Sequence, residues 1–577
     1  MWGEAPHKRR KANAECRPKL AAAASQLYGM YRIHTYPIEM YIHSYSQDEY
    51  RRCKLKTGIY HIVPKACKDR IAERRLMLMK TEEKYKKETM AIFRHLFSIS
   101  AIASVLWVYI DTPKQVYFCP LSRAGLNDWS DENCYWSTSY AEAREKFVAV
   151  GNRLREQVAS RGGEDGAPLL DLLDVQSISY DVTGNKSFKV FDASTQQTIL
   201  PENDSIDAIL LTMRVPDDHI DIIHSSGTHG VEGYLGSAVQ LRFLHSIFLQ
   251  NEEHLLQSNG QNNNARESGK VRKILLIHAV NPYGMRHHRR TNENNVDLNR
   301  NVLANDMIKT VIERNPNYFG YEDMDPALNP VYSPTSHQNI NELPKLSSQD
   351  TIQSFMQEFV TISTVIWSIM KIILLKGYTN AKRTVVSAQY HKNTGVFYGG
   401  NGKWENSIVA VQHAIDEFAD FRLNSVNPDL QTKVFWIDIH TGLGKYGSWT
   451  SLSKNSITDN CGSWTSQLNS LITSLEEKQA SNRRAVNSGY EHTVGFVNGN
   501  LFCPFPSCFA ITQEFGTRPG LAVILALVLE NKGFNWGKSE FAFLTSNAFQ
   551  PQRLSWRRAT LRGGTEILQT AINFRPR

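Results

Sequence analysis

The stretch that decides the fold is Ser225-Ser226-Gly227-Thr228-His229-Gly230-Val231-Glu232-Gly233. The largely apolar run 220–223 before it predicts a buried strand, and the apolar spacing over Tyr234–Gln250 predicts a helix. His229 and Glu232 therefore lie where a strand passes into a helix, three residues apart and on one face. An imidazole nitrogen and a carboxylate oxygen that converge in this way suit a zinc ion. A simpler interpretation is that His229 caps the turn and Glu232 favours the positive end of the helix.

Two further motifs follow in order. Lys273–Val280 predicts a second buried strand, which ends at Asn281-Pro282-Tyr283-Gly284. Next comes Arg289-Arg290-Thr291-Asn292-Glu293-Asn294-Asn295-Val296-Asp297-Leu298-Asn299-Arg300-Asn301. His-x-x-Glu, then Asn-Pro-x-Gly, then Val-Asp-Leu-Asn-Arg-Asn resembles the zinc carboxypeptidase superfamily. The forms Gly-Thr-His-Gly-Val-Glu-Gly and Arg-Arg-x-Asn-Glu-x-Asn-Val-Asp resemble one branch of it, catalogued as a domain of unknown function.

Two more apolar strands each bring a polar residue to their end. Lys433–Gly444 contains His440, and Phe509–Thr517 contains Glu514. Open α/β sheets place their sites along the carboxyl edge of the strands, so we expect these residues to meet there. The predicted fold class is α/β: a mixed, mainly parallel sheet flanked by helices, with a helical insertion and an N-terminal extension.

The resemblance implies a catalytic site built around one Zn²⁺ per chain. His229, Glu232 and His440 match the family's metal ligands, and two histidines with one carboxylate are an established zinc set. Glu514 matches the family's general base, which takes a proton from water while the metal polarises the scissile carbonyl.

The resemblance also assigns substrate-binding residues. Asn299 and Arg300 match the pair that receives the substrate's terminal carboxylate, for which the planar fork of arginine is suited. Arg290 matches the arginine that stabilises the oxyanion, with Arg289 as the alternative register; for all three arginines a surface ion pair is the simpler interpretation.

Two other positions stay open. Asp438 is either an acceptor for a ligand histidine or a polar residue at a strand end. The family's mobile tyrosine has three candidates here: Tyr398, Tyr446 and Tyr490.

We therefore expect a zinc metallocarboxypeptidase-like hydrolase that cleaves a peptide or amide bond adjacent to a free carboxylate. One alternative keeps the metal and takes N-acyl amino acids, as the aspartoacylase-like relatives do. A second alternative is a non-enzymatic, membrane-anchored binding protein on an inherited hydrolase fold. The expected partner of this protein is accordingly a peptide or an N-acyl amino acid.

Composition and charge exclude some classes. The 577 residues carry a net charge of +8, but residues 1–90 hold 20 Lys and Arg against 10 Asp and Glu. The rest of the chain is nearly neutral, so a nucleic-acid-binding surface is not indicated. Eight cysteines are too few for a disulfide scaffold. Cys503 and Cys508 either form a bridge or are buried free thiols.

The chain divides by composition into three parts. Residues 1–89 form a basic extension, disordered or not translated if Met90 is the start. Residues 90–115 contain the apolar run Leu96–Ile110, which predicts a signal or membrane anchor and hence a membrane or secretory location, with a cytoplasmic enzyme as the alternative. Residues 116–577 form the catalytic domain, with an insertion at about 303–385. Within the insertion, Ile352–Leu375 predicts a core or lid helix.

Overall fold

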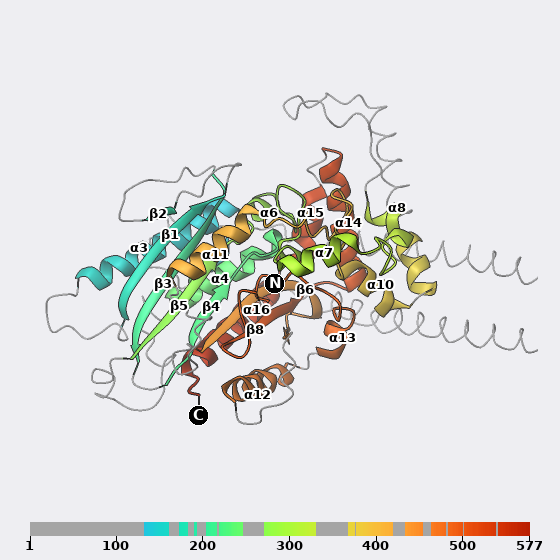
Figure 1. Cartoon of the computed structure of the whole chain (residues 1–577). Helices are drawn as coiled ribbons and strands as arrows, with labels where there is room; N and C mark the ends of the chain where they lie inside the picture. Colours follow the sequence, from blue (N-terminus) through green and yellow to red (C-terminus); the bar gives the residue numbers. More distant parts are fainter. Residues whose placement is uncertain are drawn as a thin grey trace, which may run out of the picture. The chain divides into compact units, whose positions relative to one another are not determined.

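The computed structural model describes thirteen segments of the chain, all within Ser100–Arg577 (Figure 1). They are residues 132–160, 172–182, 190–192, 203–215, 218–245, 270–329, 367–375, 377–418, 433–453, 463–479, 483–499, 501–537 and 541–576. The predictions for the basic extension 1–89 and for the apolar run Leu96–Ile110 lie outside the described residues. None of the helices in these segments is long and apolar enough to cross a membrane.

Eight strands form one sheet in the order β2-β1-β3-β5-β4-β6-β8-β7. Their bounds are β1 Leu172–Asp181, β2 Val190–Asp192, β3 Ser205–Val215, β4 Asp221–Ser225, β5 Lys270–His278, β6 Val434–Tyr446, β7 Trp449–Leu452 and β8 Cys508–Gly516. The four central strands β5, β4, β6 and β8 are parallel, and the outer strands pair antiparallel. This arrangement confirms the predicted fold class.

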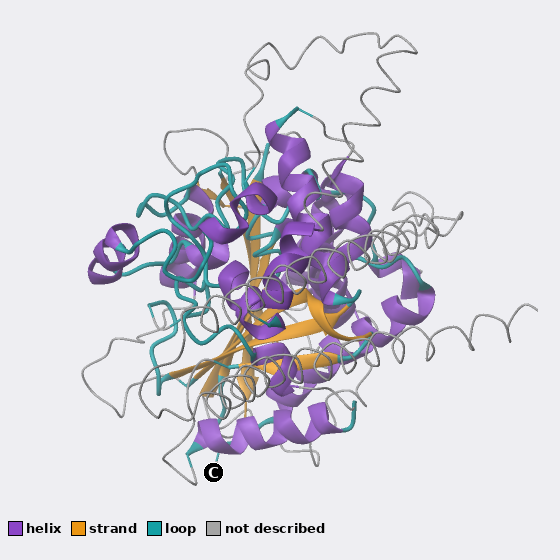
Figure 2. Cartoon of the chain, turned by 90° about the vertical axis from the view of Figure 1, so that its right-hand side faces the viewer, coloured by secondary structure: helices purple, strands orange, loops and turns teal. Residues whose placement is uncertain are grey.

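Helices flank the sheet (Figure 2). Their bounds are η1 Glu132–Tyr135, α3 Tyr140–Ser160, η3 Gly230–Glu232, α4 Gly233–Leu244, α6 Pro282–Arg286, η6 Leu298–Arg300, α7 Asn305–Glu313, η7 Glu322–Met324, α8 Asp325–Leu328, α10 Tyr378–Val386, α11 Asn406–Phe418, α12 Trp464–Glu477, α13 Arg483–Asn487, α14 Gly520–Asn535, α15 Ala542–Phe549 and α16 Leu554–Asn573. Residues 367–375 are also helical.

The core lies on both faces of the sheet because successive side chains of a strand point to opposite sides. In β4, Ile222 packs with apolar side chains of α3, α4, α12 and α16. Its neighbour Ile223 packs on the other face, with α11. Burial on both faces explains why the central strands are continuously apolar in sequence.

The insertion is partly described. The predicted helix Ile352–Leu375 is helical over 367–375, while residues 352–366 lie outside the described part. The helices α7, α8 and α10 lie in the same stretch, which was predicted to be an insertion. Residues 367–375 and α10 contribute to the wall of the main pocket, as described below.

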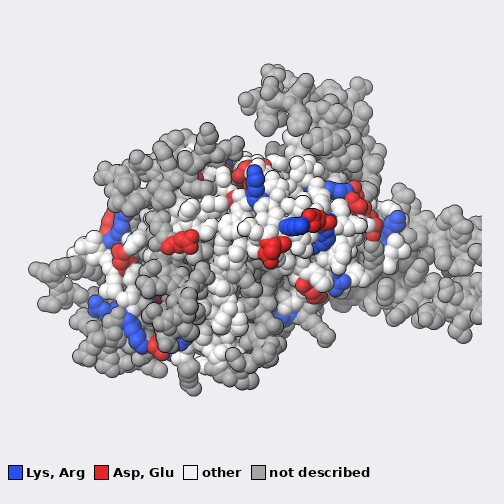
Figure 3. Space-filling view, in the orientation of Figure 1, with Lys and Arg blue, Asp and Glu red and all other residues white. Residues whose placement is uncertain are grey.

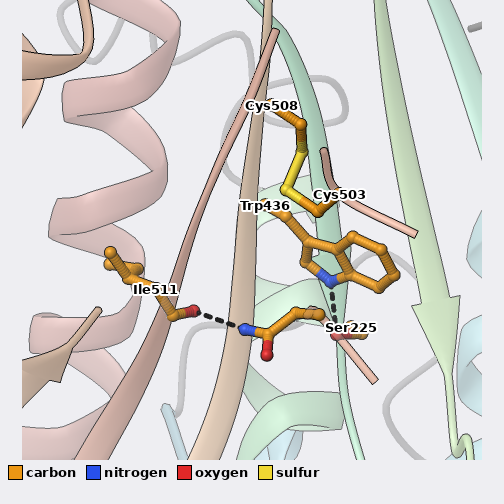
Figure 4. The surroundings of a disulfide bond; sticks show 6 residues. Ser225, Trp436, Cys503, Cys508 and Ile511 are labelled. Carbon is orange, nitrogen blue, oxygen red and sulfur yellow. Dashed lines mark hydrogen bonds between the residues drawn. A yellow bond between two sulfur atoms is a disulfide. The ribbon is translucent and has the colours of Figure 1, made fainter. Parts of the chain in front are cut away.

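Cys503 and Cys508 form a disulfide bond with an S–S distance of 2.01 Å, which decides between the two interpretations of this pair (Figure 4). Both cysteines are buried. Cys508 begins β8, and Trp436 of the neighbouring strand β6 lies beside the bridge and donates a hydrogen bond to Ser225 (2.8 Å). The bridge therefore fixes the chain just before the strand that carries Glu514.

On the face drawn in Figure 3, acidic and basic side chains of the described residues lie interspersed. This distribution is consistent with the nearly balanced charge of the sequence after residue 90.

Candidate metal site

Three predicted ligands meet at the carboxyl ends of adjacent strands. His229 lies in the turn after β4 and Glu232 ends the short helix η3, while His440 lies in β6, which pairs with β4. Nδ1 of His229 is 2.9 Å from Oε1 of Glu232 and 3.0 Å from Nδ1 of His440. Nδ1 of His440 is 3.1 Å from Oε2 of Glu232. All three side chains are buried.

The turn that carries His229 depends on close backbone packing. A Cβ atom on Gly230 would lie 2.0 Å from the backbone carbon of Gly284. The backbone N–H of Val231 donates to the carbonyl of Arg289 (2.8 Å). The turns Gly-Thr-His-Gly and Asn-Pro-Tyr-Gly, which follow β4 and β5, therefore pack directly against each other. His229 occupies the N-cap position of η3 but makes no side-chain capping bond, so its side chain does not cap the turn.

Each histidine is oriented by a carboxylate on its far nitrogen. Nε2 of His229 donates to Asp297 (3.2 Å), and Nε2 of His440 donates to Asp438 (2.6 Å). Such partners fix the tautomer of a ligand histidine, so both Nδ1 lone pairs face Glu232. The two Nδ1 atoms lie 3.0 Å apart, and their lone pairs repel each other unless a cation or a proton lies between them.

The electrostatics of the site agree with this geometry. Burial disfavours the charge on His440, but Asp438 and Glu232 outweigh it and raise its pKa to about 10. Burial likewise opposes ionisation of Glu232, but His229 and His440 hold its pKa below the usual range. These shifts favour a positive charge on His440 and a negative charge on Glu232.

The group His229, Glu232 and His440 could hold a metal ion, since one donor atom from each lies within 4.8 Å of the others. A tetrahedral zinc site with ligand distances of about 2.0–2.1 Å separates its donors by roughly 3.3 Å. The observed separations of 2.9–3.1 Å are close to this value. The residues fit a zinc-type cation in number, chemistry and spacing.

The two neighbouring arginines have different surroundings. Arg290 lines the pocket, donates from Nε to Asp297 (3.0 Å) and lies 3.6 Å from Glu232. Arg289 instead donates to Glu530 (2.6 Å) and lies over the ring of Phe534. Of the two predicted registers, only that of Arg290 places a guanidinium beside the metal group.

Glu514 enters the same pocket from β8, opposite His440 in the sheet register. Its Oε1 accepts a hydrogen bond from the backbone N–H of Leu443 (2.9 Å). Burial and the nearby charge of Glu232 raise the pKa of Glu514 to about 7. A carboxylate with that pKa can accept and release a proton near neutral pH.

Asn299 and Arg300 also line the pocket, in the short helix η6. Arg300 is buried, and two of its nitrogens donate to the carbonyls of Val386 (3.1 Å) and Asn299 (2.6 Å). Among the described residues, its Nη2 makes no hydrogen bond. The fixed guanidinium therefore retains an amino group for an anionic partner.

Of the three tyrosine candidates, Tyr490 lines the pocket. Burial, followed by the charge of Glu514, raises its pKa above the usual range. Tyr398 packs in the core beneath the sheet, and Tyr446 is exposed at the end of β6.

Asp297 was not predicted as a partner of His229, and two interpretations of Asp438 were left open. Asp297 lies inside the quoted Val-Asp-Leu-Asn-Arg motif, two residues before Asn299. Asp438 lies two residues before His440 on the same strand, and it also accepts from Ser225 (2.7 Å) and Thr228 (3.0 Å). A carboxylate within two residues of a predicted site residue was the available signal.

Comparison with known proteins and protein families shows to which family the chain belongs. A search of curated proteins gave no match. A family model described as "Protein of unknown function (DUF2817)" matches residues 202–563. The match covers all the residues that surround the metal group, from the turn after β4 to Glu514, and more than half of the chain. The protein therefore belongs to the DUF2817 family.

Proposed function

We propose that this protein is a zinc-dependent hydrolase that cleaves an amide or peptide bond adjacent to a free carboxylate. One observation carries the proposal: a His-Glu-His metal group and a separate carboxylate, Glu514, share one pocket with Asn299 and Arg300. Glu514 is not needed to complete a three-ligand set. Its raised pKa suits a general base rather than a ligand.

In this proposal each residue has a distinct task. Arg300 binds the substrate carboxylate through its open amino group, and Asn299 supports it. Arg290 stabilises negative charge on the carbonyl oxygen. Glu514 takes the proton from the attacking water and passes it to the leaving nitrogen. The bound metal, held by His229, Glu232 and His440, would supply Lewis acidity and lower the pKa of water.

The disulfide supports a proposal about location. Stable disulfides form in oxidising compartments, and the bond between Cys503 and Cys508 lies in the matched domain. We therefore retain the secretory or membrane route as the proposed location.

Metal analysis combined with a substrate panel tests the proposal. The purified chain should retain about one zinc ion after mild chelation, and His440→Ala should lose most of it. His413→Ala, an exposed histidine on α11, is the matched control and should keep its zinc. Equal zinc in the His440→Ala protein and the parent would refute the metal assignment. If the zinc-loaded protein hydrolyses neither peptides with a free C-terminal carboxylate nor N-acyl amino acids, the activity is refuted and the protein is a binding protein.

A further inference from the structure

The pocket that contains the metal group is much larger than the catalytic residues require. Its volume is about 780 Å³, within the range of roughly 300–1,000 Å³ found for small-molecule sites. Charged and imidazole side chains line it at the metal group, and Lys382 and Glu491 line it as well. Among the described residues, the rest of the wall is mainly apolar and comes largely from residues 369–386, from residues 487–501 and from α14.

The insertion builds one side of this apolar wall. Ile369 and Ile373, four residues apart on the helix 367–375, both line the pocket. Tyr378, Ala381 and Val385 line it from α10 at helical spacing. The end of α10 is fixed to the site, because Arg300 donates to the carbonyl of Val386. The apolar wall is therefore continuous with the carboxylate-binding residues.

Helix α14 builds the other side. Leu521, Ile524 and Leu527 line the pocket at intervals of three residues. The helix is apolar around most of its circumference over residues 521–529, and it packs against α15. An apolar helix must bury every face. In α14, the face that does not pack on protein lines the pocket.

Three polar groups in this wall already have partners, whereas the hydroxyl of Ser453 has none among the described residues. Nζ of Lys382 donates to the carbonyl of Val486 (2.6 Å), and Nδ2 of Asn498 donates to that of Ile511 (3.2 Å). Oγ1 of Thr493 donates to Val386 (3.3 Å). A peptide in this space would bury amide groups with few partners, which is costly. An aliphatic chain has no such requirement.

Exposed apolar side chains line the pocket, together with the exposed Glu491. Tyr378 and Leu501 both line the pocket, yet 52% and 44% of their surfaces are exposed. Exposed apolar side chains beside an apolar cavity suit a ligand that is itself amphiphilic.

We propose that the substrate is an N-acyl amino acid with a long aliphatic acyl chain. This inference rests on the proposed function. The amino acid carboxylate binds Arg300, the amide lies at the metal group, and the acyl chain fills the apolar cavity. Hydrolysis breaks the amide C–N bond; the water oxygen enters the fatty acid carboxylate, and the amino acid leaves as its ammonium form.

A chain-length series with the zinc-loaded protein tests the proposal. N-acetyl, N-octanoyl and N-dodecanoyl derivatives of one amino acid are compared with tripeptides of similar size. Each buried methylene contributes up to about a fourfold gain. We expect kcat/KM for the dodecanoyl compound to exceed that for the acetyl compound by at least about a hundredfold. Equal rates across the series, or faster cleavage of tripeptides, would overturn the substrate class.

A variant tests whether the acyl chain occupies this cavity. Ala381→Phe fills part of the cavity, so it should remove most of the chain-length gain, measured as the ratio of kcat/KM for the dodecanoyl and acetyl compounds within the variant, while the zinc content stays unchanged. Ala559→Phe, on an exposed part of α16, is the matched control and should keep the gain. If Ala381→Phe retains the full chain-length gain in kcat/KM, the acyl chain does not bind in this cavity. If Ala381→Phe does not fold, the series on the parent protein still decides.

A binding measurement separates this inference from the proposed activity. Calorimetric titration of Glu514→Gln with N-dodecanoylglycine and N-acetylglycine requires no turnover. Tight binding of the long compound alone, with no hydrolysis by the parent, would support the ligand class and reject the activity. Hydrolysis of short compounds with no preference for long ones would reject the ligand class and keep the activity.

Discussion

Nε2 of His440 lies 2.6 Å from Oδ2 of Asp438, two residues earlier on the same strand. Residues i and i+2 of a strand point to the same face, so this pairing follows from strand geometry. Asp438 also accepts hydrogen bonds from the hydroxyls of Ser225 and Thr228, which fix the carboxylate. The orientation of His440 is thus set by β6 and by the turn after β4 together.

The first prediction concerns this pairing. Asp438→Asn keeps the size of the side chain but removes the charge that fixes the tautomer of His440. Zinc affinity should fall about 10- to 100-fold, as for other partners of ligand histidines. Competition with a chromogenic chelator measures it. Thr228→Val removes the hydroxyl that donates to both oxygens of Asp438 (3.0 and 3.2 Å) and leaves the contact between Asp438 and His440, so it should have a smaller effect. Unchanged affinity in Asp438→Asn would show that Asp438 only fills space.

The second prediction separates the adjacent arginines. Arg290→Lys loses the guanidinium fork beside Glu232 and should lower kcat/KM by about a hundredfold with zinc retained. Arg289→Lys disturbs the buried pair with Glu530 and should reduce the free energy of unfolding by about 1–3 kcal/mol, with near-normal kcat/KM. Urea unfolding and steady-state kinetics on both variants provide the test. The reverse pattern would assign the role at the site to Arg289.

The central sheet was predictable because its strands are buried on both faces and read as continuous apolar runs. The same property brought His229, Glu232, His440 and Glu514 to one edge, since each follows or ends such a run. The outer strands were not predicted. β1 alternates buried and partly exposed residues, and β7 has only four residues, so neither gives a long apolar run.

The pocket wall could not be predicted from the sequence. The residues of α10 and α14 that line it are separated by more than a hundred positions, and nothing local shows that they face each other. The difference between Arg289 and Arg290 is also tertiary, because Glu530 and Phe534, which contact Arg289, come from a distant helix.

The third prediction concerns acid stability. Burial lowers the pKa of His278 to about 3, below the value of roughly 6.5 in an unfolded chain. The contribution of neutral His278 to the free energy of unfolding is complete above pH 6.5. It is lost as the pH falls, because only the unfolded chain takes up the proton. His278→Gln should therefore reduce the slope of the free energy of unfolding against pH by about 1.4 kcal/mol per pH unit below pH 6.5. Urea unfolding of chelated protein at pH 7.5, 6.5 and 5.5 tests it, and equal slopes would contradict it.

The fourth prediction concerns metal binding and pH. Because Asp438 and Glu232 outweigh burial and raise the pKa of His440 to about 10, the free site holds a proton on this ring at neutral pH. Metal binding must displace that proton. Apparent zinc affinity should thus rise about tenfold per pH unit between pH 6 and 9. Chelator competition across this range measures it, after correction for the chelator. A flat profile would mean that no ligand loses a proton.

The last prediction concerns Glu514, which we expect to act as a base and not as a fourth ligand. Glu514→Gln keeps the side-chain size and the bond from Leu443 N–H but removes the basicity. Turnover should fall by roughly a hundred- to ten-thousandfold, while zinc content and substrate binding persist. Burial and Glu232 raise its pKa to about 7, and kcat/KM of the parent should fall as pH drops because the protonated carboxyl cannot accept a proton; the bound cation favours the carboxylate and moves this limb below 7.

The matched control for Glu514 is Glu491, a carboxylate that lines the same pocket but pairs with Arg383 (3.3 Å). Glu491→Gln should retain near-normal turnover and the acid limb of the pH profile. The Glu514→Gln variant should lose that limb along with most of its rate, because the limb reports ionisation of the missing group. Loss of zinc from Glu514→Gln would instead make Glu514 a ligand. Near-normal turnover with zinc retained would require another residue in the pocket to accept the proton.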